Sequence, residues 1–422
     1  MSVFWTELRR SPAKWWAPVI AAVIGAYLVA RYGHWEGVWT QASTAVQVGT
    51  GLAAPFMTAA AAWTAYRRTA SRLDRQAAVS ATSPWKRELV TLAAVLSYAW
   101  VPVLAAYAVV TVMTVPATSR GTIWPTYILL ALSIALLAVA FGYFMGRALP
   151  SPFTVPAASL FMMILVFLGD TDERFALMTL YGYPDVVVSW SALAARAGLA
   201  LSILALALAA GAIRDWHRSR HAVVRRFSWG LVCCMILLAA TMTYTAGPLQ
   251  VPRYYHGNNG ACTDTYPMVC VWQEHEKYLP MMADYVERFN ELDEFLLLPN
   301  DPYQGMDQFW EEGMRGDVGD QLTFFGGGFG AANGMVAYAM DVSGFPGCEV
   351  GPEHPDAERL AAAYWQLSDW LTAYIMEVDS TADMGVSAPG LDSIDEVLAM
   401  PEDRQFEWAH GKVAELRAPC DV

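Results

Sequence analysis

The residues best suited to chemistry in this sequence are a histidine between two glutamates, Glu274-His275-Glu276. Imidazole and carboxylate groups bind zinc, so His275 and Glu276 are a candidate metal site. The helical metallopeptidase motif needs a second histidine one turn later, and none follows. Three further histidines could approach only through the fold: His256, His354 and His410. We therefore expect no metal and no cofactor, and interpret the segment as a helix start, where acidic side chains are favoured.

A second candidate site is the glycine-rich run at residues 324–334. Glycine permits tight turns and the close approach of a ligand or another backbone. The phosphate-binding loop of an ATPase requires a lysine after its glycines, and no Lys or Arg lies beside this run. We expect a flexible loop here, with a ligand-docking surface as the alternative. We find no ATPase motif and no catalytic residue in the sequence.

The six cysteines fall into two environments. Cys233 and Cys234 lie within an apolar run. The other four lie in the C-terminal part: Cys262, Cys270, Cys348 and Cys420. Four cysteines in an exported domain predict two disulfides. Of the three possible pairings we prefer Cys262–Cys270 with Cys348–Cys420, and four free thiols in a cytoplasmic domain is the alternative.

Charge divides the chain at the same place. Residues 1–249 hold 19 of the 27 Lys and Arg but only 9 of the 40 Asp and Glu. Residues 250–422 hold the remaining 8 basic and 31 acidic residues. Such an acidic region repels phosphate backbones, which argues against nucleic acid as a partner. An excess of acid could attract basic peptides or divalent ions, and it is also typical of an ordinary solvated surface.

The first half of the chain reads as a series of membrane spans, because each needs about 20 mostly apolar residues. Seven nearly uncharged runs fit: 15–32, 46–66, 89–115, 122–146, 153–169, 190–213 and 228–247. Basic residues gather before the first span, between the second and third, after the fourth and between the sixth and seventh. By the positive-inside rule the N-terminus is cytoplasmic and the C-terminal domain is extracellular.

Charges inside the spans are rare. Arg196 is the exception, and it lies near the outer end of the sixth span, where it can extend to the headgroups. We see no carboxylate deep in a span, which argues against proton- or sodium-coupled transport and ion conduction. The second span instead carries small residues and Pro55, which favour close helix packing or a substrate path.

Three features together resemble a known family. They are the segment 3–10 before the first span, the basic connection 66–89 with Pro84 before the third span, and six spans with both ends inside. On these features residues 1–226 resemble the permease subunit of an ABC-2-type exporter. In that family the basic connection contacts the ATPase. The resemblance thus implies an ATPase-coupling loop formed by Arg67, Arg68, Arg72, Arg75, Lys86 and Arg87.

The resemblance implies a plasma-membrane protein whose partners are a cytoplasmic ATPase subunit, a second permease subunit, identical or different, and the lipid bilayer. The expected fold is membrane all-α: a six-helix ABC-2-like core (1–226), a seventh transmembrane helix (227–249) and an acidic, disulfide-bonded, mainly helical α+β domain (250–422). The seventh span and the large C-terminal domain depart from a minimal permease. The transported substrate is not readable.

Within residues 250–422 helical periodicity predicts helices at 276–296, 303–315, 354–377 and 392–417. Residues 322–325 and 335–340 read as short strands. An alternative function follows from this domain: the spans could anchor an extracytoplasmic enzyme or receptor, such as a degenerate metallopeptidase or a ligand sensor. Metal analysis of the isolated domain, with and without His275→Ala, separates the two hypotheses.

Overall fold

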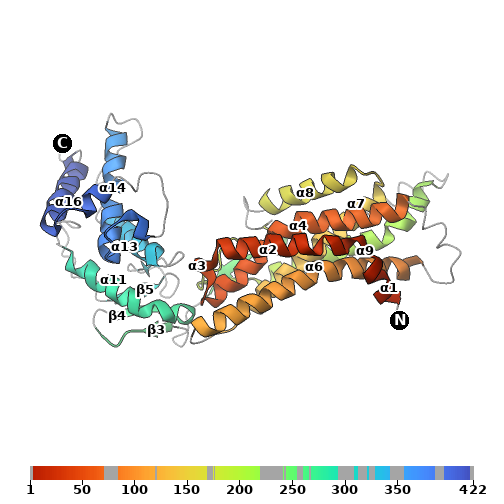
Figure 1. Ribbon diagram of the computed structural model, residues 1–422, viewed down its shortest axis with the longest axis horizontal. Coiled ribbons are helices and arrows are strands. Elements are labelled where there is room, and N and C mark those ends of the chain that lie inside the picture. Colours follow the sequence, from red (N-terminus) through yellow and green to blue (C-terminus); the bar gives the residue numbers. More distant parts are fainter. Residues whose placement is uncertain are drawn as a thin grey trace. The chain divides into compact units, whose positions relative to one another are not determined.

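The computed structural model describes residues 3–70, 84–118, 121–168, 174, 176–218, 241, 244–253, 260–265, 268–292, 308–311, 321–322, 328–342, 356–384 and 394–418. The chain divides into two compact units, Met1–Pro252 and Arg253–Val422. We call them the helical unit and the C-terminal unit. Each unit has its own hydrophobic core. Figure 1 shows the helices and strands of both units.

Long apolar helices make up the helical unit. Five stretches are long and apolar enough to cross a membrane: Pro12–Ala30, Trp39–Ala70, Lys86–Ala117, Pro125–Ala148 and Trp190–Ala209. They include α2 (Ala17–Ala30), α4 (Trp39–Ala70), α6 (Pro84–Thr114), α7 (Pro125–Ala148) and the first part of α9 (Trp190–Arg218). Helices suit lipid because they satisfy their backbone hydrogen bonds internally. The chain is thus a mainly helical membrane protein, and five predicted spans correspond to such helices.

Helix α4 lies at the centre of the helical unit, in contact with α2, α6, α7 and α8. Gly142 and Gly146 of α7 lie against the backbone of Thr58 and Ala62 in α4. The Thr58 hydroxyl donates a hydrogen bond across to the carbonyl oxygen of Ala138 at 3.1 Å. Small residues on both helices allow this approach, which is how helices associate when lipid removes the hydrophobic driving force. Residue numbers rise together along both helices in these pairs, so α4 and α7 run parallel.

The fifth predicted span, 153–169, corresponds to a shorter helix, α8 (Thr154–Leu168). Its 15 residues are fewer than the roughly 20 that a crossing needs. The Ser159 hydroxyl of α8 donates to the carbonyl oxygen of Pro55, and Thr179, after α8, donates to Gln47. Residues 176–180, which are described and not helical, therefore lie beside α4. Non-helical backbone at membrane depth must be buried in protein. Thr179 meets this requirement, since it is buried.

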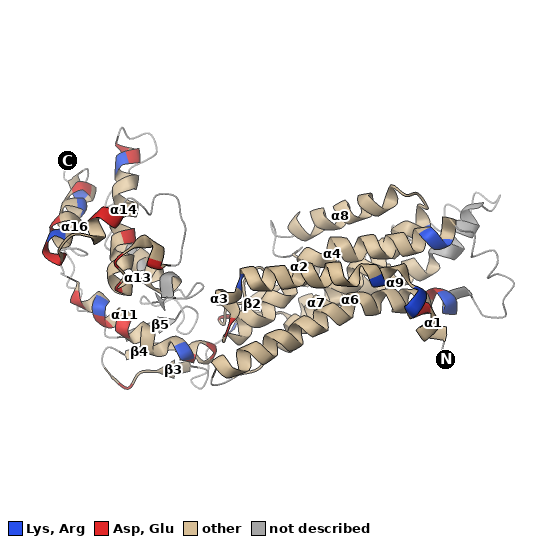
Figure 2. Cartoon of the chain, viewed as in Figure 1, with Lys and Arg blue, Asp and Glu red and all other residues tan. Residues whose placement is uncertain are grey.

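The two ends of the helical unit differ. One end, where α4 finishes and α6 begins, carries Arg67, Arg68, Lys86, Arg87 and Arg147; we call it the basic end (Figure 2). At the other end β1 (Val186–Val188) pairs with β2 (Gln250–Pro252) in a two-stranded antiparallel ribbon. We call this end the ribbon end. The short helices α1 (Val3–Arg10) and α3 (Tyr32–Trp35) precede and follow α2. Most of the predicted seventh span, 228–247, lies outside the described residues.

The C-terminal unit contains a four-stranded sheet in the order β3-β4-β5-β6. The antiparallel pair β3 (Gly260–Cys262) and β4 (Met268–Trp272) is extended by two parallel strands, β5 (Gln308–Glu311) and β6 (Gln321–Leu322). The main helices are α11 (Leu279–Glu291), α13 (Gly328–Val342), α14 (Ala357–Met376) and α16 (Glu402–Arg417), with a short α15 (Asp395–Leu398). Helices α11, α14 and α16 fall within predicted helices.

Three local predictions for this unit are wrong. Residues 335–340, predicted as a strand, lie in α13, where Ala331, Met335 and Met340 are buried at roughly helical spacing. Residues 328–334 of the glycine-rich run also belong to α13 and not to a loop. Inside the helix predicted at 303–315, residues 308–311 form β5, where aromatic residues favour a pleated backbone.

Candidate functional site

A buried ion pair lies at the basic end between α6 and α7. Arg147 Nη2 lies 2.8 Å from Glu88 Oε1, and the Tyr143 hydroxyl donates a hydrogen bond to the other Glu88 oxygen. Arg147 Nη1 donates to the Thr69 hydroxyl of α4 at 3.1 Å. The side chains of Arg147 and Glu88 are 7% and 11% exposed. The two charges are thus nearly removed from solvent, and each is matched by the other.

The same network continues to α1. Arg68 Nη1 lies 3.5 Å from Glu7 Oε1, and the Thr91 hydroxyl of α6 donates to that oxygen at 2.9 Å. Arg68 also interacts electrostatically with Tyr143 and Glu88, which connects the two halves. We call this set the basic-end cluster: Glu7, Arg68, Thr69, Glu88, Thr91, Tyr143 and Arg147. It joins α1, α4, α6 and α7.

Such a cluster fixes the helices to one another. Leaving one partner of a buried ion pair without the other costs about 3–5 kcal/mol, because the remaining charge stays desolvated. The helices that share the cluster are therefore expected to move together at the basic end. A displacement applied to the start of α6 would reach α7 through Glu88 and Arg147, and α4 through Arg147 and Thr69.

The predicted ATPase-coupling residues surround this cluster. Lys86 and Arg67 are exposed, and Arg87 is partly exposed. Arg68, predicted in the same role, faces inward and pairs with Glu7. Arg72 and Arg75 lie outside the described residues. The four described members thus fall into two groups: three lie at an accessible surface, and Arg68 forms a partly buried ion pair.

The sequence interpretation missed the ion pair of Glu88 with Arg147. Glu88 precedes the predicted span 89–115 by one residue and was therefore taken as part of the loop. In the structure α6 begins at Pro84, so Glu88 lies within the helix. A signal was present. Glu88 is the only acidic residue in the five described long apolar stretches, and a charge inside a span needs a partner. Tyr143 and Arg147 offer one, since they lie one turn apart on α7.

Arg196 was predicted to extend to the headgroups. In the structure it is instead buried, with 3% of its surface exposed. Its guanidinium donates to the carbonyl oxygens of Ala176 at 2.7 Å and Arg174 at 3.1 Å, as well as to Ala192 of its own helix at 3.0 Å. Residues 174 and 176 lie outside any helix, so their carbonyls lack helical donors. Arg196 therefore satisfies backbone groups of the segment that follows α8.

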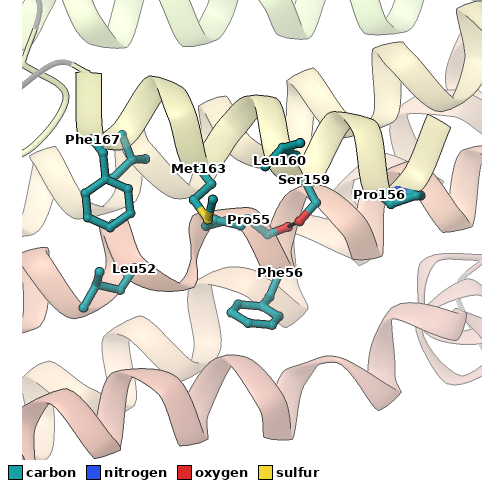
Figure 3. Close-up of a pocket in the computed structure, with 10 residues that line it drawn as sticks. Leu52, Pro55, Phe56, Pro156, Ser159, Leu160, Met163 and Phe167 are labelled. Carbon is teal, nitrogen blue, oxygen red and sulfur yellow. Dashed lines mark hydrogen bonds between the residues drawn. The ribbon is translucent and has the colours of Figure 1, made fainter. Parts of the chain in front are cut away.

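An apolar pocket of about 350 Å³ lies between α4 and α8 (Figure 3). Ten residues line it: Gly51, Leu52, Pro55, Phe56, Pro156, Ser159, Leu160, Met163, Val166 and Phe167. Ser159 is the polar member, and its hydroxyl donates to the Pro55 carbonyl oxygen at 3.0 Å. The pocket therefore presents hydrocarbon, and Leu160 and Phe167 at its edge are exposed. In a membrane these exposed side chains contact lipid.

The C-terminal unit contains one of the two expected disulfides. Cys262 and Cys270 are bonded across the paired strands β3 and β4, where they are direct neighbours in register. Cys348 and Cys420 lie outside the described residues. The hairpin is thus covalently closed at this register position.

The candidate metal residues do not form a ligand set. His275 is buried, 1% exposed, and packs edge-on against Tyr278. The preceding Glu274 pairs with Arg253 at 2.8 Å, and the Arg253 guanidinium lies over the Trp272 ring. Within the described part of the chain no three His, Cys, Asp or Glu side chains are grouped to hold a metal ion.

Comparison of the chain with protein-family models, with curated proteins and with solved structures gives no match.

Proposed function

We propose that the chain is the permease subunit of an ATP-driven exporter whose energy comes from a separate cytoplasmic ATPase. The observation that carries the proposal is the basic-end cluster. It lies where α4 ends and α6 begins, beside the basic connection that resembles an ATPase-coupling loop. A partner that binds Lys86 and its neighbours would act on α6, and the buried Glu88–Arg147 pair would pass that displacement to α7 and α4.

The charge distribution is consistent with external energy. Ion-coupled transporters carry acidic groups deep in their spans, where protons or sodium ions bind. In the five described long stretches the acidic residue is Glu88, close to a helix end and paired with Arg147. A subunit driven by ATP hydrolysis elsewhere needs no such group. The proposal includes a second permease subunit, a cytoplasmic basic end and an extracellular C-terminal unit.

The test is isolation of the tagged full-length protein from native membranes. We expect an ATPase to co-purify, and the double variant Lys86→Glu/Arg87→Glu to lose it. Arg404→Glu is the matched control, since Arg404 is an exposed cation of the C-terminal unit. If no ATPase accompanies the unaltered protein after mild crosslinking, the exporter proposal fails.

A second candidate, a membrane anchor for an extracytoplasmic receptor or enzyme, is favoured by the separate core of the C-terminal unit. It predicts that this unit binds a ligand in the absence of any ATPase. Binding of zinc or a peptide to the full-length protein, together with a failure to capture an ATPase, would support this candidate over the exporter.

A further inference from the structure

The N-terminal half of α4 contributes to a second polar cluster, far from the basic end. It consists of five uncharged side chains, which we call the ribbon-end cluster: Thr44 and Gln47 of α4, Tyr127 of α7, Thr179 and Gln250 of β2. The first four are at most 5% exposed. The Tyr127 hydroxyl interacts with Thr44, Thr179 and Gln250, and the Gln250 amide nitrogen lies 3.5 Å from it. The exporter proposal assigns these residues no role.

Two hydrogen bonds fix the orientation of the Gln47 amide. The backbone N–H of Thr179 donates to Gln47 Oε1 at 3.2 Å, and the Thr179 hydroxyl donates to the same oxygen at 2.9 Å. A backbone N–H can only donate, so the atom it meets must be the carbonyl oxygen of the side chain. The amide cannot be reversed without losing this bond, and Nε2 is therefore held as a donor of two N–H groups.

Nε2 has no hydrogen-bond acceptor in the described part of the chain, although Gln47 is fully buried. Native proteins rarely leave a buried donor unsatisfied, and ordered water is the usual partner of such a group. Hydroxyls of Thr179 and Tyr127 belong to the same cluster, and a hydroxyl accepts hydrogen bonds as well as donating them. A water bound to Nε2 would thus find further polar partners nearby.

We propose that Gln47 Nε2 binds a water molecule, which makes the ribbon-end cluster a hydrated site inside the helical unit. The ligand is an oxygen acceptor such as water and not a cation, because a fixed pair of N–H donors repels a cation. The site lies on the central helix, where it contacts the segment that follows α8. This inference does not depend on the exporter proposal, because hydration of the site needs no partner protein.

Radiolytic hydroxyl labelling of the full-length protein in lipid nanodiscs, with mass spectrometry, tests the site. A water bound beside a buried ring is activated in place and oxidises that ring. We expect Tyr127 to be oxidised severalfold faster than Tyr143, which lies on the same helix and is equally buried, 0% exposed. Equal, slow oxidation of the two tyrosines in the unaltered protein would overturn the proposal.

The variant Gln47→Met keeps the length of the side chain and removes both N–H donors. We expect it to reduce Tyr127 oxidation to the rate of Tyr143. Thr64→Val, a buried hydroxyl in the other half of α4, should leave the Tyr127 rate unchanged. If a folded Gln47→Met variant retains fast oxidation of Tyr127, water reaches that ring without Gln47 and the assignment is wrong. The comparison of the two tyrosines stands even if the variant does not fold.

Discussion

Gly142 of α7 lies directly against the backbone of Thr58 in α4, and a methyl group at position 142 would overlap the Thr58 carbonyl oxygen. Gly146, one turn later, lies in the same way against Ala62. Two glycines four residues apart thus form a flat strip on α7, which brings it into backbone contact with α4. Small residues on α4 and glycines on α7 together allow this close packing, which places α4 at the centre of the unit.

The first prediction concerns this strip. Gly142→Ala is expected to lower the free energy of unfolding by about 1–3 kcal/mol, since the added methyl must separate two helices packed through their backbones. The control is Gly198→Ala in α9, where a methyl group would meet nothing within 4 Å. Thermal unfolding in detergent measures both variants. An unchanged midpoint for Gly142→Ala would show that the helices are further apart than described.

The second prediction concerns the buried ion pair. Glu88→Gln should destabilise the protein by about 3–5 kcal/mol, because Arg147 then remains buried without its counter-charge. Replacing both residues, as Glu88→Leu/Arg147→Met, should cost less than the sum of the single changes, since no charge is left desolvated. Glu407→Gln provides the control: its pair with Arg404 is 2.6 Å long but exposed, and salt screens it. Strictly additive effects of Glu88 and Arg147 would refute the coupling.

The sequence predicted the apolar spans because lipid imposes a local requirement: about 20 apolar residues in succession. Charge and cysteine content likewise separated the two halves of the chain, and the disulfide-bonded cysteines are only eight residues apart. Each of these signals is contained in a short stretch of residues, which can be read without knowledge of the fold.

The polar contacts could not be read in this way. Glu88 and Arg147 are 59 residues apart, and Gln47 and Thr179 are 132 residues apart. No local pattern records such a pair, because the partners meet only when segments far apart in the sequence pack together.

The third prediction concerns the closed hairpin. Peptide mapping without reductant should find Cys262 linked to Cys270, as the strand pairing places them. The double variant Cys262→Ser/Cys270→Ser should lower the stability of the C-terminal unit by about 2 kcal/mol, the value for a short closed loop. A reducing agent should bring the unaltered protein to the same unfolding midpoint and leave the variant unaffected. Free thiols at both positions in protein isolated from intact cells would instead indicate a reducing, cytoplasmic location.

The fourth prediction concerns Asp369 on α14, whose partial burial raises the pKa of its carboxyl above the ordinary value. Burial penalises the charged form, so the folded state favours the protonated acid. The resulting stability is fully present below the unfolded pKa of about 3.9 and is lost as the pH rises through the higher folded pKa. At pH 7 the folded protein therefore carries an unfavourable charge at this position.

Asp369→Asn should accordingly raise the thermal midpoint of the C-terminal unit at pH 7, and the gain should shrink as the pH falls towards 4. Scanning calorimetry of the full-length protein at both pH values measures this difference, with Asp264→Asn, an exposed position, as the control. The removal of a negative charge is the same in both variants, so only burial distinguishes them. A lower midpoint for Asp369→Asn at neutral pH would mean that a neighbouring group stabilises the carboxylate by more than its desolvation costs.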